Sequence, residues 1–113
     1  MDMQISSLAP DVLRVALSGR LDSPGVDQIE TKFTAALVPS GAHAAVDLSK
    51  VDFVGSMAIR MFISVARALG KHKGKLVLYA PQPLVNEVFT TVALSELIPI
   101  LADADAAVLA ARS

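Results

Sequence analysis

The 113-residue sequence contains no cysteine and no tryptophan, and only 4% of its residues are aromatic. The absence of cysteine excludes disulfide bonds, thiolate metal sites and thiol nucleophiles. The scarcity of aromatic rings leaves few faces on which a base or a sugar can stack, so we expect no nucleic-acid or glycan partner. The net charge of −1 provides no long-range field for DNA or anionic lipid. We therefore expect partners that are recognised by local shape.

The sequence also lacks a long hydrophobic run. No stretch approaches the roughly 20 apolar residues of a membrane-spanning helix, and the first residues, MDMQISSLAPD, lack the basic and apolar segments of a signal peptide. We expect a single domain over residues 1–113 that is cytoplasmic and does not insert into a membrane. The mean hydropathy is nevertheless high, at +0.54. This value indicates either a well-buried sheet or an exposed apolar face used for binding.

Hydrophobic periodicity predicts alternating strands and helices after an initial hairpin. The order β-β-α-β-α-β-α-β-α predicts an α/β fold, in which about four helices pack on a mixed sheet of four to five strands. Strands are predicted at 3–8, 12–18, 44–48, 75–80 and 98–101, and helices from 23 to near 39–41, from 56 to about 70, from 83 and after an Asp103 cap. The third helix is predicted to have an apolar face formed by Leu84, Val85, Val88, Phe89 and Val92.

Two connections are predicted to lead from strands into helices. Gly19 to Asp22 is expected to form a loop, with Ser23 as the N-cap of the first helix and Pro24 in its first turn. Ser49 to Gly55 is expected to connect the central strand to the helix that opens at Ser56. Because the first N–H groups of a helix have no internal partner and the macrodipole is positive there, a phosphate on Ser56 would be tolerated.

The central helix carries its polar residues on one narrow stripe, with apolar residues, among them Met57, expected to be buried. Arg60 lies one turn after Ser56, so a phosphoserine would have a guanidinium within reach. The stripe can be either a solvated face or a docking surface. Its members are Ser56, Arg60, Ser64, Arg67 and Lys71, at spacings of four, four, three and four.

Three residues have a structural interpretation beside a functional one. Ser56 can be an unmodified N-cap, since serine is common at that position. Asp22 can be a loop residue that accepts hydrogen bonds from nearby amides, or it can touch a partner. Asp47, near a strand end, is more typical of a structural acceptor than of a catalytic base.

The two histidines do not support catalysis. His43 precedes a strand, and His72 lies at the far end of the helix that begins at Ser56, roughly 20 Å away. A serine nucleophile would need a histidine within hydrogen-bond reach. Two histidines without convergent carboxylates give no metal site, and the sequence contains no phosphate-binding or dinucleotide motif. We therefore expect no enzyme, metal or cofactor.

The turn that reads Gly55, Ser56, Met57, Ala58, Ile59 follows an apolar strand and opens a helix. It resembles the Asp-Ser-Ser/Thr/Ala-Gly-Leu turn of the STAS domain, a family named for sulphate transporters and anti-sigma factor antagonists. Gly19, Arg20, Leu21 and Asp22 resemble the Gly-Glu-Leu-Asp element of this family. Lys73 to Lys75 and Pro83 to Leu94 fall where the family has a strand entry and its third helix. The resemblance spans nearly the whole chain.

The resemblance implies an anti-sigma factor antagonist that acts by partner switching. The unphosphorylated form would bind an anti-sigma factor that is itself an ATP-dependent serine kinase, phosphorylation of Ser56 would end this binding, and a PP2C-type phosphatase would restore it. The partner-binding residues implied are Asp22, Ser23, Gly55, Ser56, Met57, Arg60 and Ser64.

The turn departs from the family pattern at two positions. Gly55 replaces the acidic residue before the serine, and Ala58 replaces the glycine two places after it. The loss of the aspartate removes a charge and a hydrogen-bond acceptor that can help a kinase to read the site. The resemblance also leaves a second function open, that of an adaptor for an ATPase subunit of a phospholipid-transport complex or for a signalling protein. A homodimer is left open as well.

Overall fold

The first two strands form an antiparallel hairpin, and every later strand runs parallel to its neighbour in the sheet order β1-β2-β3-β4-β5. This computed structural model describes all residues, 1–113. The predicted α/β fold with a mixed sheet and four helices is confirmed. The strands are β1 (Asp2–Ala9), β2 (Val12–Leu21), β3 (His43–Val54), β4 (Leu76–Tyr79) and β5 (Ile100–Leu101); the helices are α1 (Ser23–Leu37), α2 (Ser56–Gly70), α3 (Pro83–Thr91) and α4 (Ala104–Arg112), with a 3-10 turn η1 (Leu94–Glu96).

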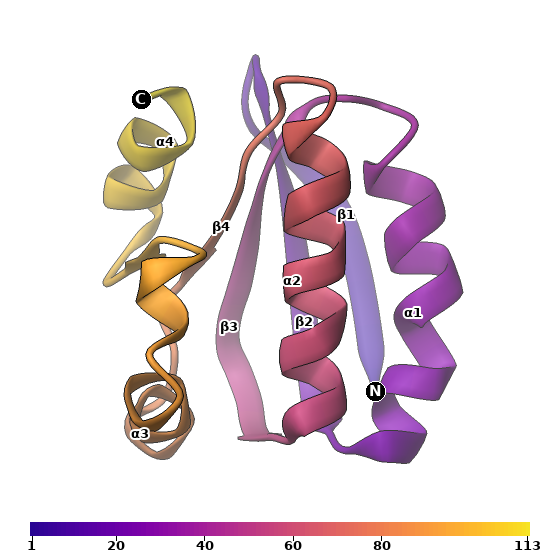
Figure 1. Cartoon of the computed structure of the whole chain (residues 1–113), viewed down its shortest axis with the longest axis vertical. Helices are drawn as coiled ribbons and strands as arrows, with labels where there is room; N and C mark the ends of the chain where they lie inside the picture. The colour runs from indigo at the N-terminus through magenta and orange to yellow at the C-terminus, as the bar shows by residue number, and fades with distance from the viewer.

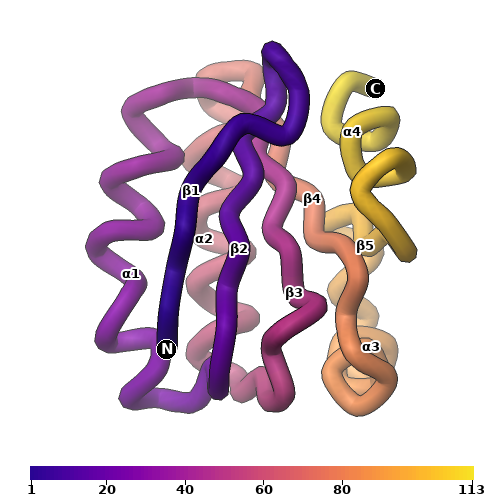
Figure 2. Tube along the Cα trace, turned by 180° about the vertical axis from the view of Figure 1, so that it is seen from behind, coloured from indigo at the N-terminus to yellow at the C-terminus, as the bar shows by residue number.

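The helices pack on opposite faces of the sheet. Figure 1 shows α1 and α2 in front of the strands, and Figure 2 shows β1 and β2 uncovered from behind. Successive side chains of β3 point to opposite faces of the sheet. Val46 lies in the larger core with α1, α2 and α3, whereas Ala45 lies in a smaller apolar cluster with α4. The edge-to-face pair of Phe33 and Phe62 joins α1 to α2 within the larger core, with ring centroids 6.0 Å apart.

A polar cluster crosses three strands on the face that α4 partly covers. The Arg14 guanidinium on β2 donates to a carboxylate oxygen of Asp47 on β3 and, at 3.0 Å, to the Tyr79 hydroxyl on β4. The other Asp47 oxygen accepts from the Ser49 N–H at 2.9 Å. Burial raises the pKa of Asp47, but these hydrogen bonds outweigh burial and hold the pKa below its usual 3.8. Asp47 is therefore a structural acceptor, as expected.

Strands β2 and β3 are longer than their sequence predicts. Residues 19–21, predicted as a loop, belong to β2, and residues 49–54, predicted as a connection, belong to β3. The two segments pair with each other through two register shifts, which bring Arg20 opposite Phe53 and Leu21 opposite Val54. The polar side chains in these segments are typical of loops. The segments are strands because they pair with each other across the sheet, which no local pattern predicts.

The third helix buries only part of its predicted apolar face. Val85 and Phe89 are buried in the larger core, whereas Leu84 is 72% exposed and Val92 is 51% exposed. The predicted apolar face of α3 is therefore only partly covered by the core. The exposed side chains leave an apolar surface beside the end of β3.

The predicted Asp103 cap of α4 is confirmed, because the Asp103 carboxylate accepts a hydrogen bond from the Ala106 N–H at 2.9 Å.

Candidate functional site

The starts of α1 and α2 lie side by side at one edge of the sheet. Because β2 and β3 are parallel, their carboxyl ends meet at this edge, and the helices that follow begin there (Figure 1). The N–H of Gly55 donates to the carbonyl of Leu21 at 3.0 Å and joins the two strand ends. This edge therefore holds five of the predicted partner-binding residues, Asp22, Ser23, Gly55, Ser56 and Met57, while Arg60 and Ser64 extend the set along α2.

The N-terminus of α2 has no side-chain cap. Gly55 is the N-cap residue, in extended conformation, and Ser56 is the first helical residue with an exposed side chain. The interpretation of Ser56 as a plain N-cap is therefore wrong. A Cβ atom at Gly55 would lie 3.5 Å from the Phe53 ring and 3.6 Å from the Leu21 carbonyl oxygen, which is ordinary contact. The fold therefore does not require glycine here, and the first N–H groups of α2 remain available to an anion.

The N-terminus of α1 is capped by a carboxylate. Asp22, not Ser23, is the N-cap, and its Oδ1 atom accepts from the Gly25 N–H at 2.9 Å. The prediction of Ser23 as the cap was wrong because the carboxylate one residue earlier fills that position equally well. The hydrogen bond from Gly25, with a smaller contribution from Arg20, lowers the pKa of Asp22. Ser23 is exposed as the first residue of the helix.

Two residues that the sequence did not single out border this edge. The Arg20 guanidinium carbon lies 4.4 Å from the centroid of the Phe53 ring, and its Nε atom lies 3.4 Å from an Asp22 oxygen. Phe53 is 38% exposed. The pairing of Arg20 with Phe53 depends on the irregular register between β2 and β3, which no local sequence pattern reveals.

The polar stripe of α2 is exposed along its whole length, as predicted. Arg60, Ser64, Arg67 and Lys71 line one shallow hollow on the helix surface. Met57, on the first turn of α2, is 39% exposed, so the prediction that it would be buried was wrong. Ala58 is fully buried and places its methyl group in the larger core. The surface around Ser56 therefore combines a hydroxyl, a thioether and a guanidinium one turn away.

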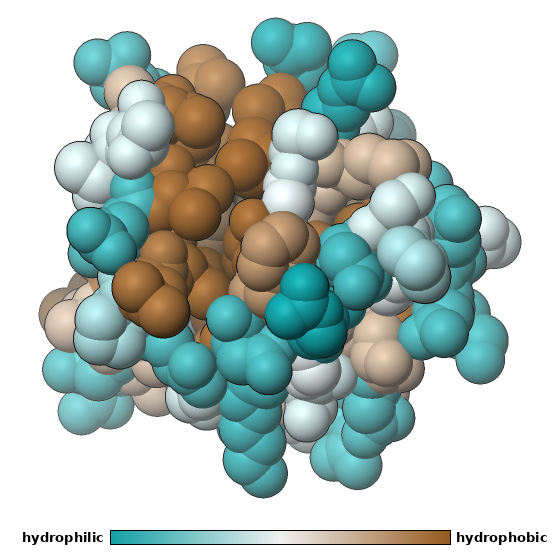
Figure 3. All heavy atoms as spheres, turned by 90° about the horizontal axis from the view of Figure 1, so that it is seen from below, coloured by the Kyte–Doolittle hydropathy of each residue, from teal (hydrophilic) through white to brown (hydrophobic).

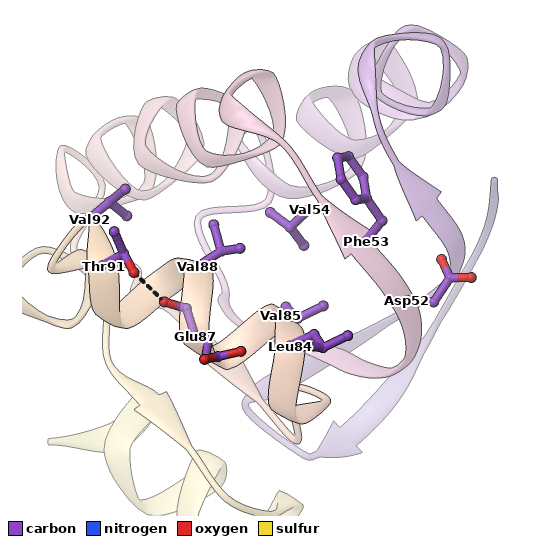
Figure 4. Close-up of a pocket in the computed structure, with 9 residues that line it drawn as sticks. All are labelled: Asp52, Phe53, Val54, Leu84, Val85, Glu87, Val88, Thr91 and Val92. Carbon is purple, nitrogen blue, oxygen red and sulfur yellow. Dashed lines mark hydrogen bonds between the residues drawn. The ribbon is translucent and has the colours of Figure 1, made fainter.

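An apolar groove of about 420 Å³ lies between the end of β3 and α3. Figure 4 shows its side chains on the two elements, and Figure 3 shows apolar side chains gathered over this end of the molecule. The sequence did not reveal this groove because the apolar periodicity of α3 does not show which of its side chains the core covers. The high mean hydropathy was the one signal for it. The lining consists of Asp52, Phe53, Val54, Leu84, Val85, Glu87, Val88, Thr91 and Val92.

No group of three or more His, Asp or Glu side chains lies close enough together to hold a metal ion. None of the helices has both the length and the hydropathy that a membrane span requires. The chemistry that the edge offers is therefore that of a surface hydroxyl near free amides, which suits an anion or a protein contact.

Known proteins are similar to this chain in sequence. The chain is 28% identical to a protein named putative anti-sigma factor antagonist BtrV from Bordetella bronchiseptica, over 90% of this chain and 88% of that protein. It is 27% identical to the anti-sigma F factor antagonist of Lysinibacillus sphaericus, over 79% and 77% of the two chains.

Solved structures show the same fold. An anti-sigma factor antagonist from Mycobacterium paratuberculosis superposes with a TM-score of 0.87 at 23% identity, over 99% of this chain and 94% of that chain. The antagonist SpoIIAA matches in its unphosphorylated form with a TM-score of 0.78 at 24% identity, over 98% and 96% of the chains. Its phosphorylated form from Bacillus matches with a TM-score of 0.67 at 21% identity, over 93% and 96%. The family model of the STAS domain matches residues 6–107, and the chain therefore belongs to the STAS domain family.

Proposed function

We propose that this protein is an anti-sigma factor antagonist that is switched by phosphorylation of Ser56. The observation that carries the proposal is the exposed Ser56 side chain at the uncapped N-terminus of α2. The names of the curated relatives support the antagonist function, and SpoIIAA, which has the same fold, is known in a phosphorylated form. The proposed partner is an anti-sigma factor serine kinase, and a PP2C-type phosphatase reverses the modification.

The edge can receive a phosphate without a change of fold. The first N–H groups of α2 have no side-chain acceptor, and the helix dipole is positive at this end. Arg60, one turn further along α2, supplies a guanidinium at the spacing where helical side chains interact. Because these donors are already in place, we expect the phosphorylated and unphosphorylated proteins to have nearly the same backbone.

Phosphorylation would instead act on the partner. The surface around Ser56 is formed by Gly55, the exposed Met57 side chain and the start of α1 with Asp22 and Ser23. A partner that covers these groups would have to desolvate an additional group with a charge of about −1.5 to −2 after phosphorylation. The partner's affinity should therefore fall, while the folded state remains intact.

The test is phosphorylation by the cognate anti-sigma factor kinase with ATP, followed by intact-mass spectrometry. We expect one phosphate on the wild type and none on Ser56→Ala. Ser6→Ala is the control, since Ser6 is an exposed serine on β1 outside the predicted partner-binding residues, and it should be phosphorylated like the wild type. A phosphate on the Ser56→Ala variant would contradict the proposal.

A second measurement follows the consequence for binding. We expect Ser56→Asp to weaken binding to the kinase at least about tenfold, with amide shift changes confined to the first turn of α2 and its neighbours. Shift changes across the whole sheet would contradict a surface switch. If the chain bound a transporter ATPase subunit equally well whatever residue occupied position 56, the adaptor function would replace the switch.

A further inference from the structure

Large apolar side chains remain uncovered next to the Ser56 edge. Leu84 and Val92 of α3 are 72% and 51% exposed, and Phe53 at the end of β3 is 38% exposed. Together with Val54, Val85 and Val88 they line the groove of about 420 Å³ between β3 and α3 (Figure 4). Chain continuity places the groove beside the proposed switch, because Val54 lies two residues before Ser56. A contiguous apolar surface of this kind marks an interaction site.

The charged side chains that line the groove are both acidic, and Arg20, which contacts the Phe53 ring, is not part of the lining. The only charged lining residues are Asp52 on β3 and Glu87 on α3, and no lysine or arginine lines the groove. The Thr91 hydroxyl is already engaged, since it donates to the Glu87 carbonyl oxygen at 2.9 Å. The groove therefore combines an apolar floor with an acidic carboxylate on each of the two elements that form it.

We propose that this groove binds an amphipathic segment of a protein partner, whose apolar side chains cover the floor and whose lysine or arginine side chains flank it. Helices that bind in grooves place apolar residues at i, i+3 or i+4, and i+7 in this way. The basic flanks would pair with Asp52 and Glu87 and give the contact its specificity. The assignment of this partner rests on the function proposed above: it is the anti-sigma factor, and the groove is the part of its contact next to Ser56.

Two other occupants fit less well. The basic stripe of α2 in a second copy has a suitable charge, but α2 exposes only one large apolar side chain, Met57 at its first turn, which is too little to cover the floor. An anionic lipid surface would be repelled by Asp52 and Glu87. A basic amphipathic segment matches both the floor and the rim.

The groove contact and the switch should respond differently to phosphorylation. A phosphate on Ser56 adds negative charge to an edge that already has an acidic groove beside it, so it does not repel a basic segment. The loss of partner affinity on phosphorylation must then come from the contact that covers Ser56 itself. Ser56→Asp is therefore expected to weaken kinase binding without weakening the binding of a basic amphipathic probe in the groove.

The probe is a synthetic helical peptide with leucines at i, i+4 and i+7 and lysines on both flanks, added to the ¹⁵N-labelled protein. We expect amide shift changes at 53–54 and 84–92, and a control peptide with glutamates in place of the lysines should bind about tenfold more weakly. Leu84→Ser should weaken binding of the lysine peptide about tenfold. Leu109→Ser is the matched control, because Leu109 on α4 is 70% exposed and lies outside the groove, and it should bind like the wild type.

The inference is overturned if the lysine peptide leaves the groove amides unchanged, or if both peptides bind equally. A dimer that Leu84→Ser dissociates in sedimentation would also overturn it, since the occupant would then be a second copy. Titration of the kinase separates this inference from the proposed function. If Ser56→Asp weakens kinase binding and Leu84→Ser does not, the function stands and the groove assignment falls. If the kinase does not bind at all but the lysine peptide binds the groove, the groove stands as a site for another basic partner and the function falls.

Discussion

Two helices begin side by side at the same edge of the sheet, and their N-termini are built differently. The start of α1 carries its own anion, because the Asp22 carboxylate accepts from the Gly25 N–H. The start of α2 has glycine at the equivalent position, with no side-chain acceptor, and places Ser56 on the surface. The first terminus is complete in itself, whereas the second has unused hydrogen-bond donors. The start of α1 therefore has a structural role, whereas the start of α2 can bind an additional anion.

The glycines at the two termini differ in the same way. A Cβ atom at Gly25 would lie 2.1 Å from the Arg20 carbonyl oxygen, so α1 could not approach the end of β2 with any other residue. Gly55 has room for a side chain and a φ of −105°, which every residue adopts. Packing therefore requires glycine in α1 but not in α2, where glycine keeps the helix start uncapped.

The largest expected effect comes from a substitution that disrupts the packing at the start of α1. Gly25→Ala should lower the free energy of unfolding by about 3 kcal/mol, because the new methyl group collides with backbone. Urea denaturation measures this change. Gly70→Ala is the control at the last residue of α2, where no atom lies within 4 Å of the added Cβ, and stability should be unchanged or slightly higher. Equal losses in both variants would show that the close approach at Gly25 is not what constrains α1.

A smaller effect comes from removing the charge at the capped terminus by acid. The pKa of Asp22 is lowered in the folded protein, so its carboxylate stabilises the fold above the unfolded pKa of about 3.9, and this contribution is lost as the pH falls through the folded value. The amide shift of Gly25, followed by NMR, should titrate with a midpoint below 3.8. Asp22→Asn keeps an acceptor but should abolish this titration. A midpoint above 4 would mean that the cap does not form in solution.

The smallest expected effect makes the two termini alike. Gly55→Asp supplies α2 with the type of cap that α1 has, and should raise the free energy of unfolding by about 0.3 kcal/mol. Gly55→Asn provides the same acceptor without the charge, so thermal unfolding of the two variants separates the hydrogen bond from the interaction with the helix dipole. A loss of stability in both variants would show that the fold needs glycine at this position after all.

Local signals predicted the elements, and long-range pairing decided their ends. The helix over 56–70 and the Asp103 cap could be read from spacing and residue type, since both depend on neighbours in the chain. The extension of β3 to Val54 could not, because it depends on pairing with β2 across two register shifts. The cap of α1 was misassigned because Asp22 and Ser23 are both good caps.

The candidate site likewise has one part that the sequence predicts and one part that it does not. Ser56 at a helix start follows from the sequence, since serine, strand and helix are adjacent in the chain. The groove does not, because its walls come from β3 and α3, and the exposure of Leu84 and Val92 depends on how α3 is placed against the end of β3. The serine at the helix start was predictable because it depends on one stretch of chain, and the groove was not because its walls come from two.

The hydrogen bonds of Arg14 to Asp47 and Tyr79 disfavour an incorrect register of β3 in the sheet. A one-residue slip of β3 against its neighbours would rotate the Asp47 carboxylate from the face shared with α4 into the hydrocarbon of the larger core and leave the guanidinium without its counterion. Misaligned sheets are thereby destabilised. Molecules that reach the native alignment all end β3 at the same residue, so they present the same serine at the rim.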